Sequence, residues 1–460
     1  MNHLANQSQA PGGLYAHRPT IHPRTVTGAN RRRKNAVNLT ILGLLAIVPW
    51  LRWDRGHGMP NQAVLFDFAA MRGYFLDLAI WPQEFYFLTA ILIIASFGLF
   101  LVTALRGRMW CGFACPQTVW TDIFVWIENS IQGDRNARLR LERMPLSFGK
   151  AVKKGITHAL WLTVSAATAL SFVVFFTDAP TALTALTSGT ASVTLLGFVL
   201  FFTLSTYLLA GWAREQMCFW MCPWPRIQGA MLDHHTVMVE YDRARGETRG
   251  QARIGQDMKG RGHCVDCRLC LQVCPTGIDI REGLQMECIG CGLCADACDG
   301  VMARFGLPSG LVGWKAQIPK PWFHRPRVLL YAGLMAVVIA CMVVAGGRRN
   351  MLELNLLHER SPLFVTLADG STRNDYTVKV INRERRERDL RLSLSGLDGA
   401  TADQDRIRTT ADDVTTFRLG IRVPARSVPG DSAALRVRLT DTETGEWTEA
   451  QTFFAGGVAR

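Results

Sequence analysis

Hydrophobic residues follow two different patterns along the chain: long apolar runs dominate up to about residue 346, and short alternating runs follow. An α-helix needs about 20 mostly apolar residues to cross the roughly 30 Å hydrocarbon core of a bilayer. Five runs approach that length, with ends defined to within a few residues: Ala36–Leu51, Phe85–Leu105, His158–Thr177, Thr190–Trp212 and Val328–Gly346. The pattern predicts about five transmembrane helices.

The first of these runs is the shortest, and a basic cluster from Arg31 to Lys34 precedes it, as in a signal peptide. No small-residue cleavage site follows, however, and the chain continues through Trp50 and Trp53. These features favour an uncleaved anchor over a removed signal peptide.

The alternating runs begin at about residue 351. Examples are Tyr376–Ile381 and Thr415–Val423, and turn-forming pairs such as Asp369-Gly370 and Pro429-Gly430 separate them. About six or seven such runs in one stretch of this length are typical of an antiparallel β-sandwich.

Charge adds an orientation to this picture. The chain carries 51 Lys and Arg against 38 Asp and Glu, a net charge of +13. Basic residues gather before the first apolar run and between residues 106 and 157, whereas the loop from 178 to 188 has none. Because basic loops stay on the cytoplasmic side, we expect the N-terminus and the loops 106–157 and 213–327 inside, and the C-terminal domain outside after an odd number of spans. This topology and contact with anionic lipid explain the positive charge, and no basic-aromatic motif indicates nucleic acid.

Eight of the 13 cysteines stand in one short segment, as C-x2-C-x2-C-x3-C-P followed by C-x2-C-x2-C-x3-C. In bacterial two-cluster ferredoxins, the fourth cysteine of each run binds the cluster of the other run. The spacing therefore predicts two [4Fe–4S] clusters, with cluster 1 held by Cys264, Cys267, Cys270 and Cys298 and cluster 2 by Cys274, Cys288, Cys291 and Cys294. Soft thiolates suit such clusters, and in the reducing cytoplasm they stay free for metal. The segment predicts transfer of single electrons.

A pair of zinc sites is the alternative use of these cysteines. Zinc ribbons combine closely spaced pairs of cysteines with a longer stretch between them, not triplets of C-x2-C-x2-C. The second run departs from the ferredoxin pattern at one point, since Asp299 follows Cys298, whereas Pro275 follows Cys274. The departure leaves the ligand set complete, so the ferredoxin interpretation is favoured.

A second cysteine motif, C-x3-C-P, occurs twice. Each half of the membrane region has the order span, span, C-x3-C-P, with Cys111 and Cys115 in the first copy and Cys218 and Cys222 in the second. This order indicates a parallel internal repeat. Residues four apart share one face of a helix, and the following proline ends or kinks it, so each pair presents two sulfurs at the cytoplasmic interface.

The four repeated thiols are compatible with several roles. Four convergent thiols suit Cu(I), whereas a single pair could contact a quinone or exchange disulfides. Packing or palmitoylation would explain one isolated motif. Two copies at corresponding positions favour a functional site, and we expect Cys111, Cys115, Cys218 and Cys222 to bind copper together.

Other cofactor classes lack their sequence signals. No C-x2-C-H motif occurs, His158 is the only histidine at a span boundary, and no G-x-G-x-x-G follows a predicted strand. Haem and dinucleotide sites are therefore not expected. Cys341 stands alone in the last span, where packing explains it. We expect no catalytic acid or base, because outer-sphere electron transfer needs none.

Several stretches resemble one known family, the cytochrome c oxidase accessory proteins named CcoG, FixG or RdxA: His263–Cys267, Cys274–Arg281, Gln285–Cys291, Asp296–Asp299, Tyr241–Glu247 and Cys111–Gln117. The resemblance covers the chain from about residue 30 to its end. It implies an integral membrane α-helical protein with a cytoplasmic two-cluster ferredoxin-like insert and a periplasmic immunoglobulin-like β-sandwich. It also implies reduction of Cu(II) to Cu(I) for assembly of a cbb3-type cytochrome oxidase, with the C-x3-C-P cysteines handling copper.

Together these patterns predict the following organisation: a disordered tail (1–35), a first transmembrane hairpin (36–106), a loop with the first C-x3-C-P (107–157), a second transmembrane hairpin (158–212), a segment with the second C-x3-C-P (213–262), the two-cluster ferredoxin-like domain (263–300), a linker (301–327), a fifth transmembrane helix (328–346) and the immunoglobulin-like domain (351–460).

We expect a multi-pass protein of the bacterial inner membrane that contacts membrane lipid, a cytoplasmic electron donor, and subunits of a cbb3-type oxidase or a copper chaperone or transporter. It could form a homo-oligomer, and no nucleic acid is expected. Two other functions stay open: a quinol-linked respiratory electron conduit, as in the polyferredoxins of nitrate and nitrous-oxide respiration, and a non-enzymatic scaffold for oxidase assembly.

Overall fold

The computed structural model describes residues 20–56, 59–256, 258, 260–427 and 430–456. The chain divides into two compact units, the first ending at Met342 and the second beginning at Val343. The predicted disorder of residues 1–19 falls outside the described residues. Residues 29–35, predicted as part of the same tail, instead form the first two turns of a helix.

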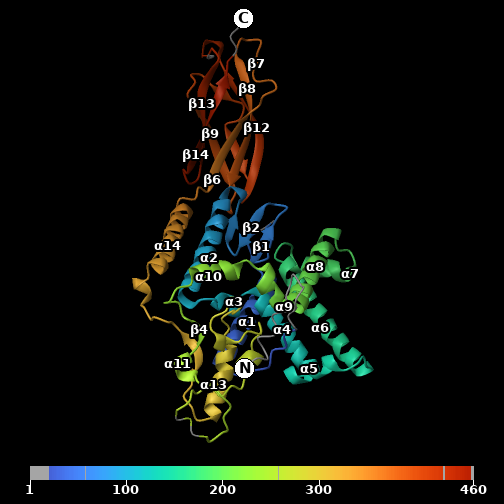
Figure 1. Ribbon diagram of the computed structural model, residues 1–460. Helices are drawn as coiled ribbons and strands as arrows, with labels where there is room; N and C mark the ends of the chain where they lie inside the picture. Colours follow the sequence, from blue (N-terminus) through green and yellow to red (C-terminus); the bar gives the residue numbers. More distant parts are fainter. Residues whose placement is uncertain (1–19, 57–58, 257, 259, 428–429, 457–460) are drawn as a thin grey trace, which may run out of the picture. The chain divides into compact units, whose positions relative to one another are not determined.

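The first unit is mainly helical (Figure 1). Its helices are α1 Ala29–Ile47, α2 Phe85–Arg106, α3 Met109–Phe113, α4 Pro116–Gln132, α5 Arg135–Arg143, α6 Phe148–Val173, α7 Ala179–Ser188, α8 Val193–Thr206, α9 Arg214–Gln216, α10 Trp224–Met231, α11 Arg243–Gly246, α12 Leu269–Gln272 and α13 Leu293–Arg304, and α14 Pro326–Gly347 crosses into the second unit. A small antiparallel sheet joins β1 Val64–Asp67, β2 Arg72–Phe75 and β3 Leu78–Ile80, and a second pairs β4 Met238–Tyr241 with β5 Val312–Lys315.

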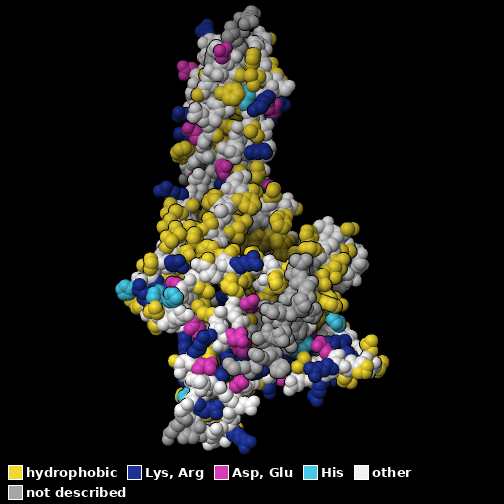
Figure 2. Space-filling view, viewed as in Figure 1, with side chains coloured by type: hydrophobic (Ala, Val, Ile, Leu, Met, Phe, Trp, Pro, Cys, Tyr) yellow, Lys and Arg dark blue, Asp and Glu magenta, His cyan; other side chains and the backbone are white. Residues whose placement is uncertain are grey.

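Among the described residues, four helices are long and apolar enough to cross a membrane: Pro82–Arg106, Phe148–Val173, Val193–Met221 and Pro326–Gly347. They contain most of the second to fifth predicted spans, although the third begins ten residues earlier than predicted, at Phe148. Most of their side chains are exposed in the folded chain, as expected for helices that face lipid, and Figure 2 shows apolar side chains gathered over α2 and α14.

The predicted first span is not among these four helices. It lies in α1, whose first turns carry Arg31 to Lys34, so α1 has no 18-residue apolar stretch. Lys34 and Asn38 are buried, because that side of α1 packs against α13, α3 and α6. At its start, α1 contacts the cysteine-rich domain, because the Asn30 side chain donates to Asp296. Just after its end, the Leu51 carbonyl accepts from the Ala63 amide, next to the sheet of β1, β2 and β3. Helix α1 is therefore about as long as a membrane span, but its sequence is not apolar enough for one.

The second unit is an antiparallel β-sandwich, as the alternating pattern predicted. One sheet has the order β10-β12-β8-β6, with β7 beside β8, and the other has the order β11-β9-β13-β14. The strands are β6 Leu352–His358, β7 Val365–Thr366, β8 Thr372–Asn382, β9 Arg388–Ser395, β10 Thr401–Ala402, β11 Arg406–Thr409, β12 Asp413–Val423, β13 Ser432–Asp441 and β14 Trp447–Ala455. Inward side chains from both sheets, such as Tyr376, Leu419 and Leu439, are fully buried in one core, which is the expected consequence of period-two alternation.

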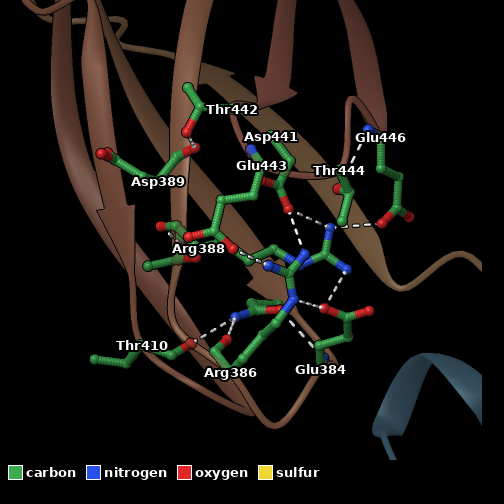
Figure 3. Close-up of polar contacts among 12 residues, drawn as sticks. Glu384, Arg386, Arg388, Asp389, Thr410, Asp441, Thr442, Glu443, Thr444 and Glu446 are labelled. Carbon is green, nitrogen blue, oxygen red and sulfur yellow. Dashed lines mark hydrogen bonds and ion pairs between the residues drawn. The ribbon is translucent and has the colours of Figure 1, made fainter.

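A buried ion-pair network joins two loops at one end of this sandwich (Figure 3). Arg388, which is fully buried, lies 3.5 Å from Asp441, 2.6 Å from Glu446 and 3.1 Å from Glu384. Arg386 pairs with the same Asp441 at 2.7 Å. The network ties the turn before β9 to the turn after β13.

Candidate metal centres

The eight clustered cysteines surround two cavities. One cavity is lined by Cys264, Cys267, Cys270 and Cys298, and the other by Cys274, Cys288, Cys291 and Cys294, with Cys270 also on its wall. The chain therefore brings Cys298 to the first run and Cys274 to the second, which is the grouping that crossed ligation requires. The assignment of each cysteine as a ligand stays a prediction.

The backbone of both loops turns in the same way around these cavities. In the first loop, Asp266 and Arg268 have φ angles of 50° and 55°, and the corresponding residues of the second loop, Gly290 and Gly292, have φ angles of 65° and 72°. Alternation between right- and left-handed conformations turns successive N–H groups into a concavity, a form that binds anions and iron–sulfur clusters. Residues other than glycine rarely adopt such φ angles. Asp266 and Arg268 in the first loop are therefore in strained backbone conformations.

The thiol donors also fit a [4Fe–4S] cluster better than a single ion. Among the described residues, no three His, Cys, Asp or Glu side chains are placed to hold one metal ion together. A zinc ion would need four sulfurs at about 2.3 Å from one centre, whereas a cluster spreads its cysteine ligands over several iron atoms. We therefore infer that the two cavities suit [4Fe–4S] clusters, which would supply one-electron transfer there.

Both acidic and basic groups lie near the first cavity. Arg281 pairs with Asp279 at 2.5 Å and with Asp266 at a shorter distance. Burial raises the pKa of Asp279, but hydrogen bonds from Arg281 outweigh it, so the net pKa is lowered and the carboxylate stays charged. Burial is the main cause that raises the pKa of the Cys298 thiol, followed by the neighbouring cysteine thiols, and Asp299 adds to the rise. Arg268 and Arg281 are on the cavity wall and both pair with Asp266, so carboxylates and arginines offset one another around the first site.

The stretch Tyr241–Glu247, noted for its family resemblance, supports this first site. The Tyr241 ring lies on the cavity wall beside Cys264, and its hydroxyl donates to Glu247 at 3.2 Å. A Cβ on Gly246 would lie 2.1 Å from that hydroxyl, so only glycine fits under the ring. The Gly246 carbonyl accepts from the Cys264 amide at 3.4 Å. The stretch therefore fixes the start of the first cysteine loop.

Two basic side chains, Lys34 and Arg108, act to lower the pKa of thiols in the second cavity. Burial raises the pKa of the Cys291 thiol to about 11, and the Lys34 ammonium offsets part of that rise. Burial likewise raises the pKa of Cys288 to about 12, and Arg108 acts in the opposite direction. Lys34 is only 1% exposed. Lys34 and Arg108 are not predicted as site residues from the sequence, where both belong to basic stretches that indicate topology.

The two C-x3-C-P motifs lie near each other and have different local structures. Cys111 lies in α3 and Cys115 caps the start of α4, whereas Cys218 lies in a π-helical turn, Met217–Met221, that Cys222 ends. Gln117 donates to the Leu209 and Arg214 carbonyls at 2.7 and 3.0 Å. These bonds satisfy carbonyls in and after a first π-turn, Tyr207–Ala213. Such turns are frequent at functional sites.

The four thiols are close enough to interact. Burial, Cys115, Cys218 and Cys222 all raise the pKa of the Cys111 thiol, to about 12, against a smaller lowering by Arg108. The Cys111 thiol donates to Gln228 Oε1 at 3.3 Å, and Gln228 is fully buried. In this structure the thiols are not gathered around a point where one ion would touch three of them, so copper binding there stays a prediction.

The first thiol motif packs directly on the second cysteine cavity. A Cβ on Gly112 would lie 2.8 Å from the carbonyl oxygens of Ile289 and Gly290 and 2.9 Å from Cys291 Cα. Arg108 strengthens the same contact, because it donates to the Cys288 carbonyl at 3.3 Å and to the Pro225 carbonyl at 2.8 Å. The thiol site and the second cavity therefore share one wall.

Two cysteine-lined cavities for iron–sulfur clusters, a nearby thiol site and apolar helices of spanning length define an iron–sulfur electron-transfer protein with membrane character. Family models agree with this class. A 4Fe–4S dicluster domain matches residues 213–317, a 4Fe–4S binding domain matches residues 87–132, and the Ig-like fold at the C-terminus of FixG matches residues 342–457.

Curated relatives identify the family. Protein RdxA of Cereibacter sphaeroides is 43% identical over 93% of this chain and 95% of its own length. The nitrogen fixation protein FixG of Rhizobium meliloti is 42% identical over 91% of this chain and 89% of its own length, and Protein RdxB of Cereibacter sphaeroides is 41% identical over 96% and 97%. The chain belongs to the FixG/RdxA family, which confirms the resemblance seen in the sequence.

Proposed function

We propose that this protein reduces Cu(II) to Cu(I) at Cys111, Cys115, Cys218 and Cys222 and so supplies Cu(I) for the assembly of a cbb3-type cytochrome oxidase. The observation that carries the proposal is the packing of Gly112 against the loop Ile289–Cys291. It places the thiol site against the second cysteine cavity with no side chain between the two backbones. Electron transfer of this kind needs positioning and a tuned potential rather than an acid or a base.

The donor chemistry at the thiol site favours the reduced metal. Sulfur is a soft ligand and prefers Cu(I). Each Cu(II) takes one electron from the reduced protein and becomes Cu(I), and the neutral thiols release protons as they bind it. The raised pKa of Cys111, to about 12, keeps that thiol neutral at physiological pH when no metal is bound.

The partners and orientation belong to the same proposal. The cysteine-rich domain lies in the cytoplasm of a bacterial inner membrane, where an electron donor reduces it, and the β-sandwich lies in the periplasm. Cu(I) leaves for a copper chaperone, a copper transporter or an oxidase subunit. Support comes from the basic residues of the first unit, which follow the positive-inside distribution, and from the family to which the chain belongs.

The test uses the full-length protein, purified without oxygen and reduced with dithionite. After removal of the reductant, Cu(II) is added with a chelator that traps Cu(I), and the EPR signal of the reduced clusters is followed together with the Cu(I) chelate. We expect one Cu(I) for each electron lost. Replacing Cys111, Cys115, Cys218 and Cys222 by serine should slow the reaction at least tenfold while the iron content stays the same.

Cys341 supplies the matched control, because it is exposed on α14 and outside both sites. Cys341→Ser should reduce Cu(II) at the wild-type rate. An equal rate in the protein without the four thiols would refute the proposal.

A second function, oxidation of a quinol, is favoured by one observation. A cavity of about 320 Å³ lies between α4, residues 21–34 and the second cysteine loop, and Cys218, Asp122 and Trp126 are on its wall. Its size and mostly apolar lining suit a ring-shaped ligand. Rapid reduction of the clusters by a short-chain quinol, without any Cu(II) reduction by the dithionite-reduced protein, would favour this function over the first.

A further inference from the structure

A basic pocket lies where α2 ends and α14 begins. The pocket measures about 460 Å³, and its lining includes His234, His235, Lys320, Arg325 and Arg327. Near the start of α14, Figure 2 shows histidine and basic side chains gathered at the edge of the apolar surface. Because α2 ends its apolar span at Arg106 and α14 starts its own at Pro326, the pocket is at the level where hydrocarbon gives way to lipid headgroups.

The pocket contains an unsatisfied buried donor. Arg325 is 4% exposed, and its Nη2 atom donates to the Ala104 carbonyl at 2.6 Å and to Asp233 at 2.9 Å. Its Nε atom is buried and has no partner among the described residues. A buried donor without an acceptor costs about 1–3 kcal/mol, so an anionic oxygen in this pocket would relieve that cost.

Two further cations on the pocket wall have no carboxylate of their own. Lys320 and Arg327 are exposed and form no ion pair within the described chain, whereas Asp233, the only carboxylate of the lining, is already paired with Arg325. Three cations thus face one acid. The excess of positive charge selects an anion.

The pocket also has an apolar border. Trp322 and Phe323 precede α14 and are 58% and 53% exposed, and Leu330 on its first turns is 58% exposed. Exposed aromatic residues at the end of a span anchor it at the headgroup level. A free phosphate ion would gain nothing from this border, but the acyl chains of a lipid would.

We propose that this pocket binds the headgroup phosphate of an anionic phospholipid, in the leaflet on the side of the cysteine-rich domain. The phosphate accepts from Arg325 and is held by Lys320 and Arg327, and the acyl chains lie along Phe323 and the start of α14. Basic pockets beside spanning helices are known to take anionic headgroups. The bound lipid would fix the height of α14 in the bilayer.

The experiment uses the full chain in nanodiscs made of equal parts phosphatidylglycerol and phosphatidylcholine. Native mass spectrometry after release into detergent gives the ratio of the two lipids that stay bound. We expect phosphatidylglycerol to be enriched on the wild-type protein. The double variant Lys320→Gln and Arg327→Gln should lose that enrichment by roughly fivefold for each cation removed.

The matched control removes two exposed cations elsewhere, Arg143→Gln and Lys153→Gln, on α5 and α6. It changes the net charge equally and should keep the enrichment. Equal loss in both double variants, or no enrichment on the wild-type protein, would overturn the proposal. Displacement of the lipid by 50-fold excess inorganic phosphate would assign the pocket to free phosphate and overturn the lipid assignment.

Discussion

Lys34 Nζ lies 3.4 Å from Asp122 Oδ1, in the interior of the first unit and within electrostatic reach of Cys291. Arg31 pairs with the same carboxylate at 2.8 Å. Two cations therefore share one anion, and the excess positive charge is next to the second cysteine cavity. Near the first cavity, Asp266 pairs with Arg281 and, at 4.0 Å, with Arg268, and Asp279 pairs with Arg281. The positive charge of Lys34 therefore acts on the second cavity.

The position of Lys34 beside the second cavity predicts that Lys34→Met lowers the reduction potential of one cluster only. A buried cation stabilises the more negative, reduced form, so its removal favours the oxidised form. We expect a shift equivalent to at least a tenfold change in the redox equilibrium, about 59 mV for one electron, for the cluster in the cavity of Cys291. An EPR-monitored redox titration that resolves both midpoints measures it.

Lys34→Arg is the control for this titration, since it keeps the charge and should restore the wild-type midpoint. The other midpoint should stay unchanged in both variants. Equal shifts of the two midpoints in Lys34→Met would mean that the mutation acts through general loosening rather than through local charge.

The contact between the thiol motif and the second cavity predicts the effect of Gly112→Ala. The added methyl group meets two carbonyl oxygens at 2.8 Å, which forces the loop Ile289–Cys291 to move. Overpacking of this kind typically costs about 1–3 kcal/mol. We expect a lower Tm and slower Cu(II) reduction, measured on the purified full-length protein.

Gly98→Ala serves as the comparison, because Gly98 also lies in a helix and a Cβ there meets nothing within 4 Å. This change should leave both the Tm and the rate near wild type. If Gly112→Ala behaved like Gly98→Ala, the shared wall would have no part in electron transfer.

Crossed ligation predicts which cysteine variants resemble each other. Cys298 is the last cysteine of the second run but lines the first cavity with Cys267, and Cys274, the last of the first run, lines the other cavity with Cys294. Cys298→Ser should therefore lose the same EPR signal as Cys267→Ser, and Cys274→Ser the same signal as Cys294→Ser. If Cys298→Ser lost the same EPR signal as Cys294→Ser, the cavity assignment would be wrong.

The sequence was most informative where spacing or alternation determines structure locally. The cysteine spacing predicted both groupings around the cavities, and the period-two runs predicted the strands of the β-sandwich, because in each case the pattern acts over a few residues. The apolar runs likewise located α2, α6, α8 and α14.

Features that depend on distant packing were not predictable. The inward face of α1 is polar because Lys34 and Asn38 reach Asp122, a residue more than 80 positions away, and a hydropathy pattern does not contain that contact. The first π-turn, Tyr207–Ala213, accepts a hydrogen bond from Gln117, which lies on another helix. Arg325 is buried by packing against residues distant in sequence, such as Ala104 and Asp233, and its local sequence does not contain those contacts.

The ion-pair network of the β-sandwich predicts a pH dependence for the second unit. Burial raises the pKa of Asp441, but the Glu443 and Thr444 backbone amides, the Thr444 hydroxyl and Arg386 together outweigh it, so the net pKa is lowered. The unfolded chain then binds protons more readily than the folded one. Stability is complete above the unfolded value of about 3.9 and is lost as pH falls through the lowered folded value.

Asp441→Asn should cost about 1–3 kcal/mol at neutral pH, since it removes a charged hydrogen-bond acceptor from Arg386 and an ion-pair partner from Arg388. The difference from wild type should shrink as the pH falls below about 4. Hydrogen–deuterium exchange of β9 and β13 in the full chain, compared between the two proteins at each pH, measures it. Asp398→Asn, an exposed carboxylate with no ion pair within the described chain, should show no such difference, and a pH-independent loss of protection in Asp441→Asn would show that its charge is not what stabilises the turn.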